Sequence, residues 1–330
     1  MAKCFICGKE INKEAVEHII PSALGGKLTA DILCKDHNSF LGSDIDADAI
    51  DVLSYFTNIL NPTRGRGGNA PDLVYNSSKG KIKRSATGEL SHEQIRPVTD
   101  KKGNTGITIS IMGENAEEKA KKISNAYIQR MGSKQGWSAE QIHREIEKSD
   151  AYIQNKAEII QCPELSISLG LGDKNSWLGI LKIAVEYAIM NDINKEYFDD
   201  KIKILNERDV EKAKCFSGFY YPEELYDQTS ICHTLILIAN NQERVLYCLI
   251  SLYNVWNSLV ILSDNYDGQD LRKCYCYDLL NKEDKSHQQI KPHVVKRKFL
   301  DEIRKPSVDN LPKLEKHIKQ FNNFFSYLKH

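Results

Sequence analysis

The chain lacks any run of about 18 or more apolar residues, so no segment is suited to cross a membrane as a helix. Its first residues, Met-Ala-Lys-Cys-Phe-Ile-Cys, also lack the apolar stretch of a secretory signal peptide. Without such a signal, reduced thiols, some of them bound to metal, explain the nine cysteines better than a disulfide framework does. We therefore expect a cytoplasmic protein that does not contact a membrane.

The chain also lacks net charge, because 45 Lys and Arg residues balance 45 Asp and Glu residues. This argues against a protein that coats nucleic acid through bulk charge. The basic residues are nevertheless unevenly distributed: residues 62–106 hold nine against four acidic residues, and the last fifty residues hold twelve against six. Either stretch could contact a polyanion, because Lys and Arg displace the counterions of phosphate. The alternative for both is a solvated surface.

No internal repeat and no β-α-β alternation occur, so neither a solenoid nor a nucleotide-binding fold is expected. A chain of 330 residues is long enough for two domains, since one core usually serves about 100–200 residues. The helix-terminating pair Asn61-Pro62 is followed by Thr-Arg-Gly-Arg-Gly-Gly-Asn, which cannot form regular structure. We therefore expect a domain at residues 1–62 and a larger one at residues 63–330.

The spacing of apolar residues predicts helices over residues 46–60, 114–131, 138–147 and 173–192. The third of these begins with the N-cap pattern Ser138-Ala-Glu-Gln141. Strands are predicted at residues 73–75, 81–83, 106–112 and 159–170, and an antiparallel meander at 231–239, 244–253 and 258–263. The predicted fold class is therefore α+β, with an antiparallel sheet in the larger domain.

Four residues near the N-terminus are spaced as metal ligands. Two residues separate Cys4 from Cys7 and Cys34 from His37, and 26 residues lie between the two pairs. This spacing allows a knuckle and the start of a helix to enclose one tetrahedral Zn²⁺ through three sulfur atoms and one nitrogen atom. A site with four protein ligands has no open position, so we expect a structural zinc that contributes folding energy to a small segment.

A second motif lies between these ligand pairs. It reads Glu17-His18-Ile-Ile-Pro21 and is followed by Gly25-Gly26, by Leu33-Cys34-Lys-Asp-His37-Asn38 and by Gly42. The two interleaved motifs resemble those of the HNH, or ββα-metal, endonucleases, and in particular the zinc-bearing branch of that family. The resemblance covers residues 1–45 and implies a zinc-stapled ββα-metal module, in which a twisted hairpin lies over a helix.

The resemblance also implies a role for each residue of the second motif. His18 would be the general base, which suits a side chain whose ordinary pKa is near neutrality. Glu17 and Asn38 would bind one catalytic Mg²⁺ or Mn²⁺, and their hard oxygen donors suit such an ion. Many members of the family have Asp at the position of Glu17. A rival assignment gives His37 to the catalytic metal instead of to the zinc.

Two further groups of charged residues follow the motif. Arg64 and Arg66 are predicted to bind backbone phosphate, the alternative being a plain exposed loop. The acidic residues Asp44, Asp46, Asp48 and Asp51 would spread over more than one face of a helix, which favours a solvated surface over a second metal site.

These interpretations predict a metal-dependent endonuclease that hydrolyses DNA phosphodiester bonds, with a larger domain that selects substrate, mediates assembly or senses a signal. Double-stranded DNA is the expected partner, and the layout resembles that of bacterial restriction or anti-phage factors. One HNH site makes one nick, so a homodimer would be one route to a double-strand break. The rival hypothesis is a non-catalytic, zinc-stabilised nucleic-acid-binding protein, although such a protein needs none of Glu17, His18 and Asn38.

Overall fold

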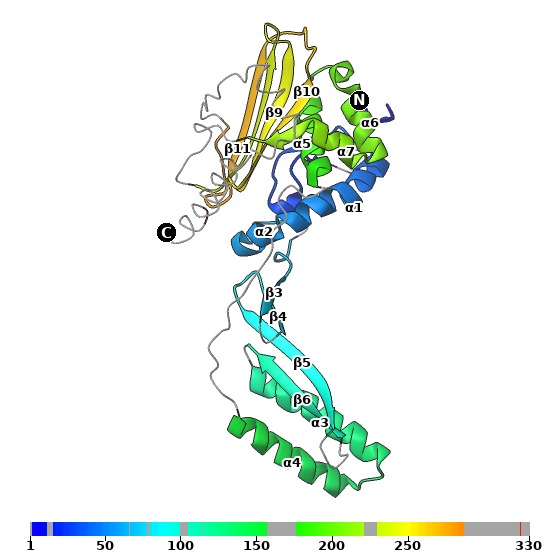
Figure 1. Ribbon diagram of the computed structural model, residues 1–330, viewed down its shortest axis with the longest axis vertical. Helices are drawn as coiled ribbons and strands as arrows, with labels where there is room; N and C mark the ends of the chain where they lie inside the picture. Colours follow the sequence, from blue (N-terminus) through cyan, green and yellow to red (C-terminus); the bar gives the residue numbers. More distant parts are fainter. Residues whose placement is uncertain are drawn as a thin grey trace. The chain divides into compact units, whose positions relative to one another are not determined.

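The computed structural model describes residues 2–11, 16–65, 67–77, 80–99, 105–113, 115–156, 176–220, 230–286 and Phe324. The chain divides into two compact units: unit 1 combines Met1–Asn69 with Leu169–His330, and unit 2 is Ala70–Ser168 (Figure 1). This grouping differs from the expected division at residues 62 and 63, because the C-terminal region packs against the N-terminal module. The predicted fold class is confirmed, since both units combine helices with antiparallel sheets.

The N-terminal part of unit 1 is a short hairpin followed by two helices. Strands β1 (Glu17–His18) and β2 (Thr29–Ala30) pair antiparallel, and the 3₁₀ turn η1 (Ser22–Leu24) lies between them. Helix α1 (Lys35–Val52) is followed by α2 (Ser54–Leu60), which ends at Asn61 as predicted. The helix predicted over residues 46–60 thus begins earlier and is interrupted near its middle. Leu41, Ile45 and Ala49, four residues apart, bury one face of α1.

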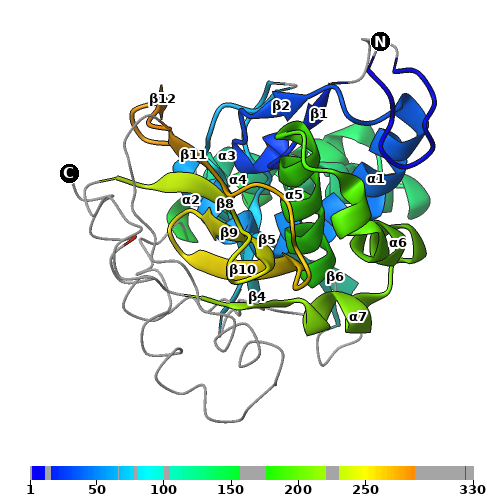
Figure 2. The ribbon, with the colours of Figure 1, turned by 90° about the horizontal axis from the view of Figure 1, so that it is seen from above.

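The C-terminal part of unit 1 is built on an antiparallel sheet (Figures 1 and 2). Its three central strands confirm the predicted meander and are buried along almost their whole length, because continuous apolar runs cover both faces. In spatial order the described strands are β12 (Glu283–Asp284), β11 (Leu271–Asp278), β8 (Cys232–Asn240), β9 (Val245–Leu252), β10 (Trp256–Ser263) and β7 (Ser217–Phe219).

Helix α5 (Ser176–Met190) lies between α1 and strands β8 to β10 (Figure 2). A Cβ atom at Gly179 would lie 2.8 Å from the Cβ of Ala49, so glycine permits the close approach of α5 to α1. The helix confirms the prediction over residues 173–192 and is buried almost all round, including its charged side chains. After it come η2 (Lys195–Tyr197), α6 (Asp199–Glu207) and α7 (Val210–Cys215).

Unit 2 contains a four-stranded antiparallel sheet and two helices. The strands are β3 (Leu73–Ser77), β4 (Gly80–Arg84), β5 (Leu90–Thr99) and β6 (Thr105–Met112), in that spatial order. Strand β5 was not predicted, whereas the other three were. Helices α3 (Ala116–Lys134) and α4 (Ala139–Lys156) confirm their predictions, and Ser138 and Gln141 form the expected reciprocal cap through bonds of 2.8 and 3.2 Å.

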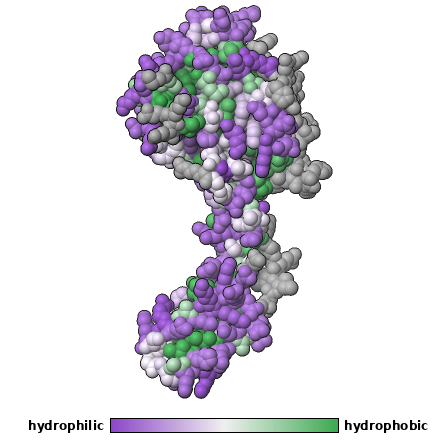
Figure 3. All heavy atoms as spheres, turned by 180° about the vertical axis from the view of Figure 1, so that it is seen from behind, coloured by the Kyte–Doolittle hydropathy of each residue, from purple (hydrophilic) through white to green (hydrophobic). Residues whose placement is uncertain are grey.

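Two predictions fall on parts of the chain that are not described: the strand at residues 159–170 and the basic C-terminal stretch beyond residue 286. On the face shown in Figure 3 the described surface is mostly hydrophilic, with apolar residues gathered in smaller patches. None of the described helices has the length and apolar character needed to span a membrane.

The loop that follows β1 is held by the C-terminal sheet. The carbonyl oxygen of Leu24 accepts hydrogen bonds from His233 Nε2, at 2.9 Å, and from the Tyr253 hydroxyl, at 2.7 Å. The backbone N–H of Tyr253 donates to Nδ1 of His233, so the imidazole ring is neutral with its proton on Nε2. His233 is completely buried, and this burial lowers its pKa from 6.5 to about 4.

We therefore expect His233 to make the stability of unit 1 depend on pH. In the unfolded chain His233 binds a proton below about pH 6.5, whereas the folded protein resists protonation down to about pH 4. The contribution of His233 to the free energy of unfolding is complete above pH 6.5. It decreases as the pH falls below that value, by up to about 3 kcal/mol. The measurement is the free energy of unfolding in urea between about pH 7 and pH 4. A His233→Asn variant is the control, and an equally steep decrease in that variant would contradict the assignment.

Candidate active site

The four predicted zinc ligands lie together at one end of the module. Their ligand atoms are all within 4.8 Å of one another. Nδ1 of His37 is 3.1 Å from Sγ of Cys34 and 3.7 Å from Sγ of Cys4, and the sulfur atoms of Cys7 and Cys34 are 3.8 Å apart. Tetrahedral zinc–sulfur bonds of about 2.3 Å place two sulfur atoms about 3.8 Å apart, so the geometry fits zinc.

Local backbone structure positions these ligands. Cys4 begins a tight knuckle, in which its N–H donates to the carbonyl of Lys9 and its carbonyl accepts from Gly8. Gly8 has a φ of 71°, a left-handed conformation that favours glycine. Cys34 is the N-cap of α1, so His37 follows within the first helical turn. Burial raises the pKa of Cys34, but hydrogen bonds from the backbone and ring of His37 lower it, and the net direction is downward.

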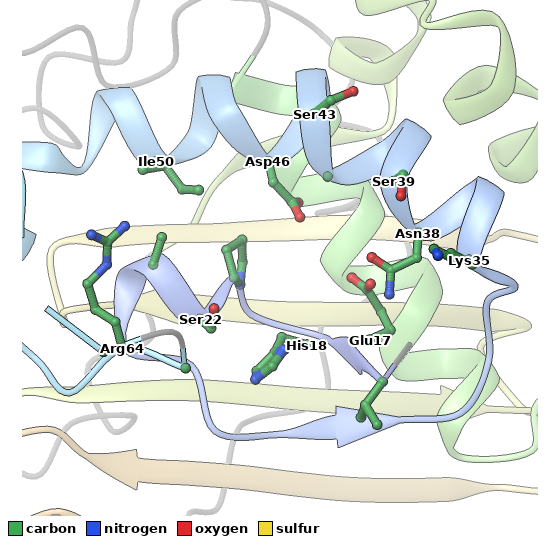
Figure 4. Close-up of a pocket in the computed structure, with 16 residues that line it drawn as sticks. Glu17, His18, Ser22, Lys35, Asn38, Ser39, Ser43, Asp46, Ile50 and Arg64 are labelled. Carbon is green, nitrogen blue, oxygen red and sulfur yellow. The ribbon is translucent and has the colours of Figure 1, made fainter. Parts of the chain in front are cut away.

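The three residues of the second motif meet at a different place, a cavity of about 860 Å³ in unit 1. Glu17 and His18 reach it from β1, and Asn38 reaches it from the first turn of α1 (Figure 4). The amide of Asn38 lies beside the carboxylate of Glu17 in this view. His37 lies with the three cysteines and is not one of the residues that line the cavity. This favours its assignment to the zinc over its assignment to the catalytic metal.

His18 lies half-buried in the cavity wall. Desolvation lowers its pKa below 6.5, and the positive charges of Lys27 and Lys182 lower it further. The imidazole is therefore neutral near pH 7 and able to accept a proton. The segment at residues 63–65 passes beside it: a Cβ atom at Gly65 would lie 3.8 Å from Nε2 of His18. Lys27 holds this segment in place through a 2.8 Å hydrogen bond from Nζ to the carbonyl of Thr63.

Glu17 is buried and forms an ion pair with a residue far along the chain. Its Oε1 lies 2.6 Å from Nζ of Lys182, on α5, and only 5% of the Glu17 side chain is exposed. Burial raises the pKa of Glu17, and the ammonium group opposes part of that shift. Burial by itself would lower the pKa of Lys182, but the charges of Glu186, Asp46 and Glu17 outweigh it and hold the ammonium protonated.

Asp46 corrects the interpretation of the acidic cluster as solvated surface. Its carboxylate lines the cavity and lies 3.0 Å from Nζ of Lys182, with 14% of the side chain exposed. The signal in the sequence was the spacing of Asn38, Gly42 and Asp46, which are four residues apart and therefore share one face of α1. Lys182 was missed as well, although a lysine within the apolar run of α5 is unusual enough to mark a buried ion pair.

The two arginines predicted to bind phosphate differ in outcome. Arg64 lines the cavity, and its Nη1 donates to the carbonyl of Asn69 at 3.3 Å. Arg66 lies outside the described residues. Arg64 is therefore placed where a phosphate bound in the cavity could reach it.

The predicted zinc site of Cys4, Cys7, Cys34 and His37 can be tested directly. We expect Cys34→Ser to release zinc and to destabilise the module, because three ligands bind zinc more weakly than four and zinc binding contributes folding energy. Zinc content by mass spectrometry and the thermal unfolding midpoint are the measurements. Cys215→Ser, which changes an exposed cysteine outside the cluster, is the matched control. A zinc content equal to that of the control would refute the ligand set.

Comparison with known proteins agrees with this geometry. A family model described as HNH endonuclease matches residues 4–54, the segment that carries the sulfur cluster and the residues Glu17, His18 and Asn38. No curated protein and no solved structure gives a significant match to the chain. The family is one of nucleases, which implies a nucleic-acid substrate. In residues 4–54 this chain is therefore similar to the HNH endonucleases.

Proposed function

We propose that the protein is a metal-dependent endonuclease that hydrolyses phosphodiester bonds of double-stranded DNA. The observation that carries this proposal is the convergence of Glu17, His18 and Asn38 on one cavity, within the segment that matches the HNH endonucleases. A module that only binds nucleic acid would need none of these three side chains in its cavity. A restriction or anti-phage role would be a further proposal, supported by the layout of the sequence alone.

The cavity offers suitable ligands for one Mg²⁺ or Mn²⁺ ion. The carboxylate of Glu17 and the amide oxygen of Asn38 are hard donors that line the same cavity (Figure 4). The carboxylate of Asp46 also lines this cavity and lies beside the ammonium group of Lys182. The bound ion would stabilise the negative charge that develops on the phosphate.

The side chains of the cavity can carry out the proton transfer. Neutral His18 would accept a proton from a water molecule as the water oxygen bonds to phosphorus and the bond from phosphorus to the leaving 3′ oxygen breaks. Arg64, which also lines the cavity, would donate hydrogen bonds to the phosphate. Zinc would have a different task, because four protein ligands leave it no position for substrate.

Plasmid cleavage tests the proposal. We expect the purified protein with Mg²⁺ or Mn²⁺ to nick supercoiled plasmid, giving open circles before linear DNA because one site cuts one strand. His18→Ala should slow the nicking by about a hundredfold or more, since general-base catalysis contributes about 10²–10⁴. His143→Ala, which changes an exposed histidine of unit 2, should nick like the wild type.

The rival hypothesis predicts a different pattern. If wild type, His18→Ala and His143→Ala all leave several DNAs intact but retard them equally in a gel, the protein is a nucleic-acid-binding protein and the enzyme proposal is wrong.

The acid limb of the pH profile gives a second test. Because only neutral His18 can act as a base and its pKa is lowered, kcat/KM for nicking should fall with decreasing pH about a midpoint below 6.5. The measurement uses saturating Mn²⁺ in buffers of constant ionic strength. A midpoint at or above 6.5 would mean that His18 is not the titrating base.

A further inference from the structure

The ammonium group of Lys182 is surrounded by carboxylates. Its Nζ atom lies 2.6 Å from Oε1 of Glu17, 3.0 and 3.2 Å from the two oxygens of Asp46, and 3.3 Å from Oε2 of Glu186. The side chains of Lys182 and Glu186 are fully buried, whereas Glu17 and Asp46 line the cavity. The ammonium donates hydrogen bonds to Glu17 and to Asp46, and it forms an ion pair with Glu186.

Three carboxyl groups within 3.3 Å of one atom form an environment that suits a cation. The carboxylate oxygens of Glu17 and Asp46 converge on one buried point behind the cavity wall, and such a point attracts positive charge strongly. The chain fills it with its own cation. Lysine reaches the point because Gly179 lets α5 approach α1 closely, one helical turn before Lys182.

We infer that Lys182 is a resident cation that fills the position between Glu17 and Asp46 and thereby confines the catalytic cation to the Asn38 side of Glu17. The inference rests on the proposed function, because it specifies where that cation binds. Lys182 is in this sense a positioning residue, since it acts through Glu17 and contacts no substrate. Asp46 then serves the ammonium and is not a ligand of the catalytic cation.

The closing experiment removes the resident charge in the full-length, zinc-loaded protein. In Lys182→Met the stem of the side chain is kept and the ammonium is lost. Mn²⁺ alone, titrated by calorimetry without DNA, should bind at least tenfold more tightly than in the wild type, because a unit positive charge beside the carboxylates has been removed. Nicking at saturating Mn²⁺ should slow at least tenfold, because the cation moves into the vacated position. A purely structural lysine would leave Mn²⁺ affinity unchanged.

Lys201→Met is the matched control. Lys201 lies on α6, is almost as buried and is paired with Asp200 at 2.7 Å, but it does not line the cavity. Its variant should bind Mn²⁺ within about twofold of the wild type. The double variant Lys182→Met/Asp46→Asn should lose the tighter binding. Unchanged or weaker binding in Lys182→Met, or tighter binding that persists in the double variant, would overturn the inference.

A second variant serves if Lys182→Met does not fold. Asp46→Asn keeps the lysine and removes one negative charge, so it should weaken Mn²⁺ binding, but by less than Asn38→Ala, which removes a ligand and should weaken binding at least tenfold. A loss in Asp46→Asn as large as the loss in Asn38→Ala would show that Asp46 binds the cation directly and would overturn the inference.

The proposed function and the inference can fail separately. If the wild type neither binds Mn²⁺ nor nicks plasmid, the proposed function is wrong. If the wild type binds Mn²⁺ and nicks plasmid but Lys182→Met binds Mn²⁺ no more tightly, the inference alone is overturned.

Discussion

The contact between the Lys182 ammonium and its carboxylates joins three parts of the chain at one buried atom. Glu17 comes from the hairpin, Asp46 from the long helix α1, and Lys182 from α5, 165 residues after Glu17. Removing one partner of a buried ion pair typically costs about 3–5 kcal/mol, because the remaining charge is left without compensation. In the folded state this contact therefore holds the hairpin, α1 and α5 in fixed positions relative to one another. The geometry of the cavity follows from these positions.

The C-terminal sheet of unit 1 also holds the hairpin in place. The turn after β1 is held through the carbonyl of Leu24 by His233 of β8 and by Tyr253, the residue that follows β9. The N-terminal module thus shares one hydrophobic core with the C-terminal sheet. Unit 2 is inserted between these two halves of the sequence. A segment of about fifty residues carries the family motifs, but residues far outside it, such as Lys182, position Glu17.

Local patterns could be read from the sequence, and non-local pairings could not. The capping box at Ser138, the helix end at Asn61 and the apolar runs of β8 to β10 each depend on neighbouring residues, so they were predicted correctly. Strand β5 was missed because its ten residues include Pro97 and alternate poorly, and it is a strand by virtue of pairing with β4 and β6. Apolar spacing predicted only the later part of α1 because its first turns are polar, whereas the family resemblance already implied a helix that starts near Cys34, and burial of Leu41 and Ile45 stabilises those turns.

The sequence by itself determined the two donor sets of the module. The spacing of Cys4, Cys7, Cys34 and His37 brings soft ligands together, and Glu17, His18 and Asn38 are recognisable by their order alone. Only the tertiary structure decided what surrounds the second set: Asp46 at the cavity and Lys182 behind it. The physical reason is that a charge is stabilised by what lies within a few ångströms in space, and Lys182 reaches Glu17 only after the intervening chain has folded.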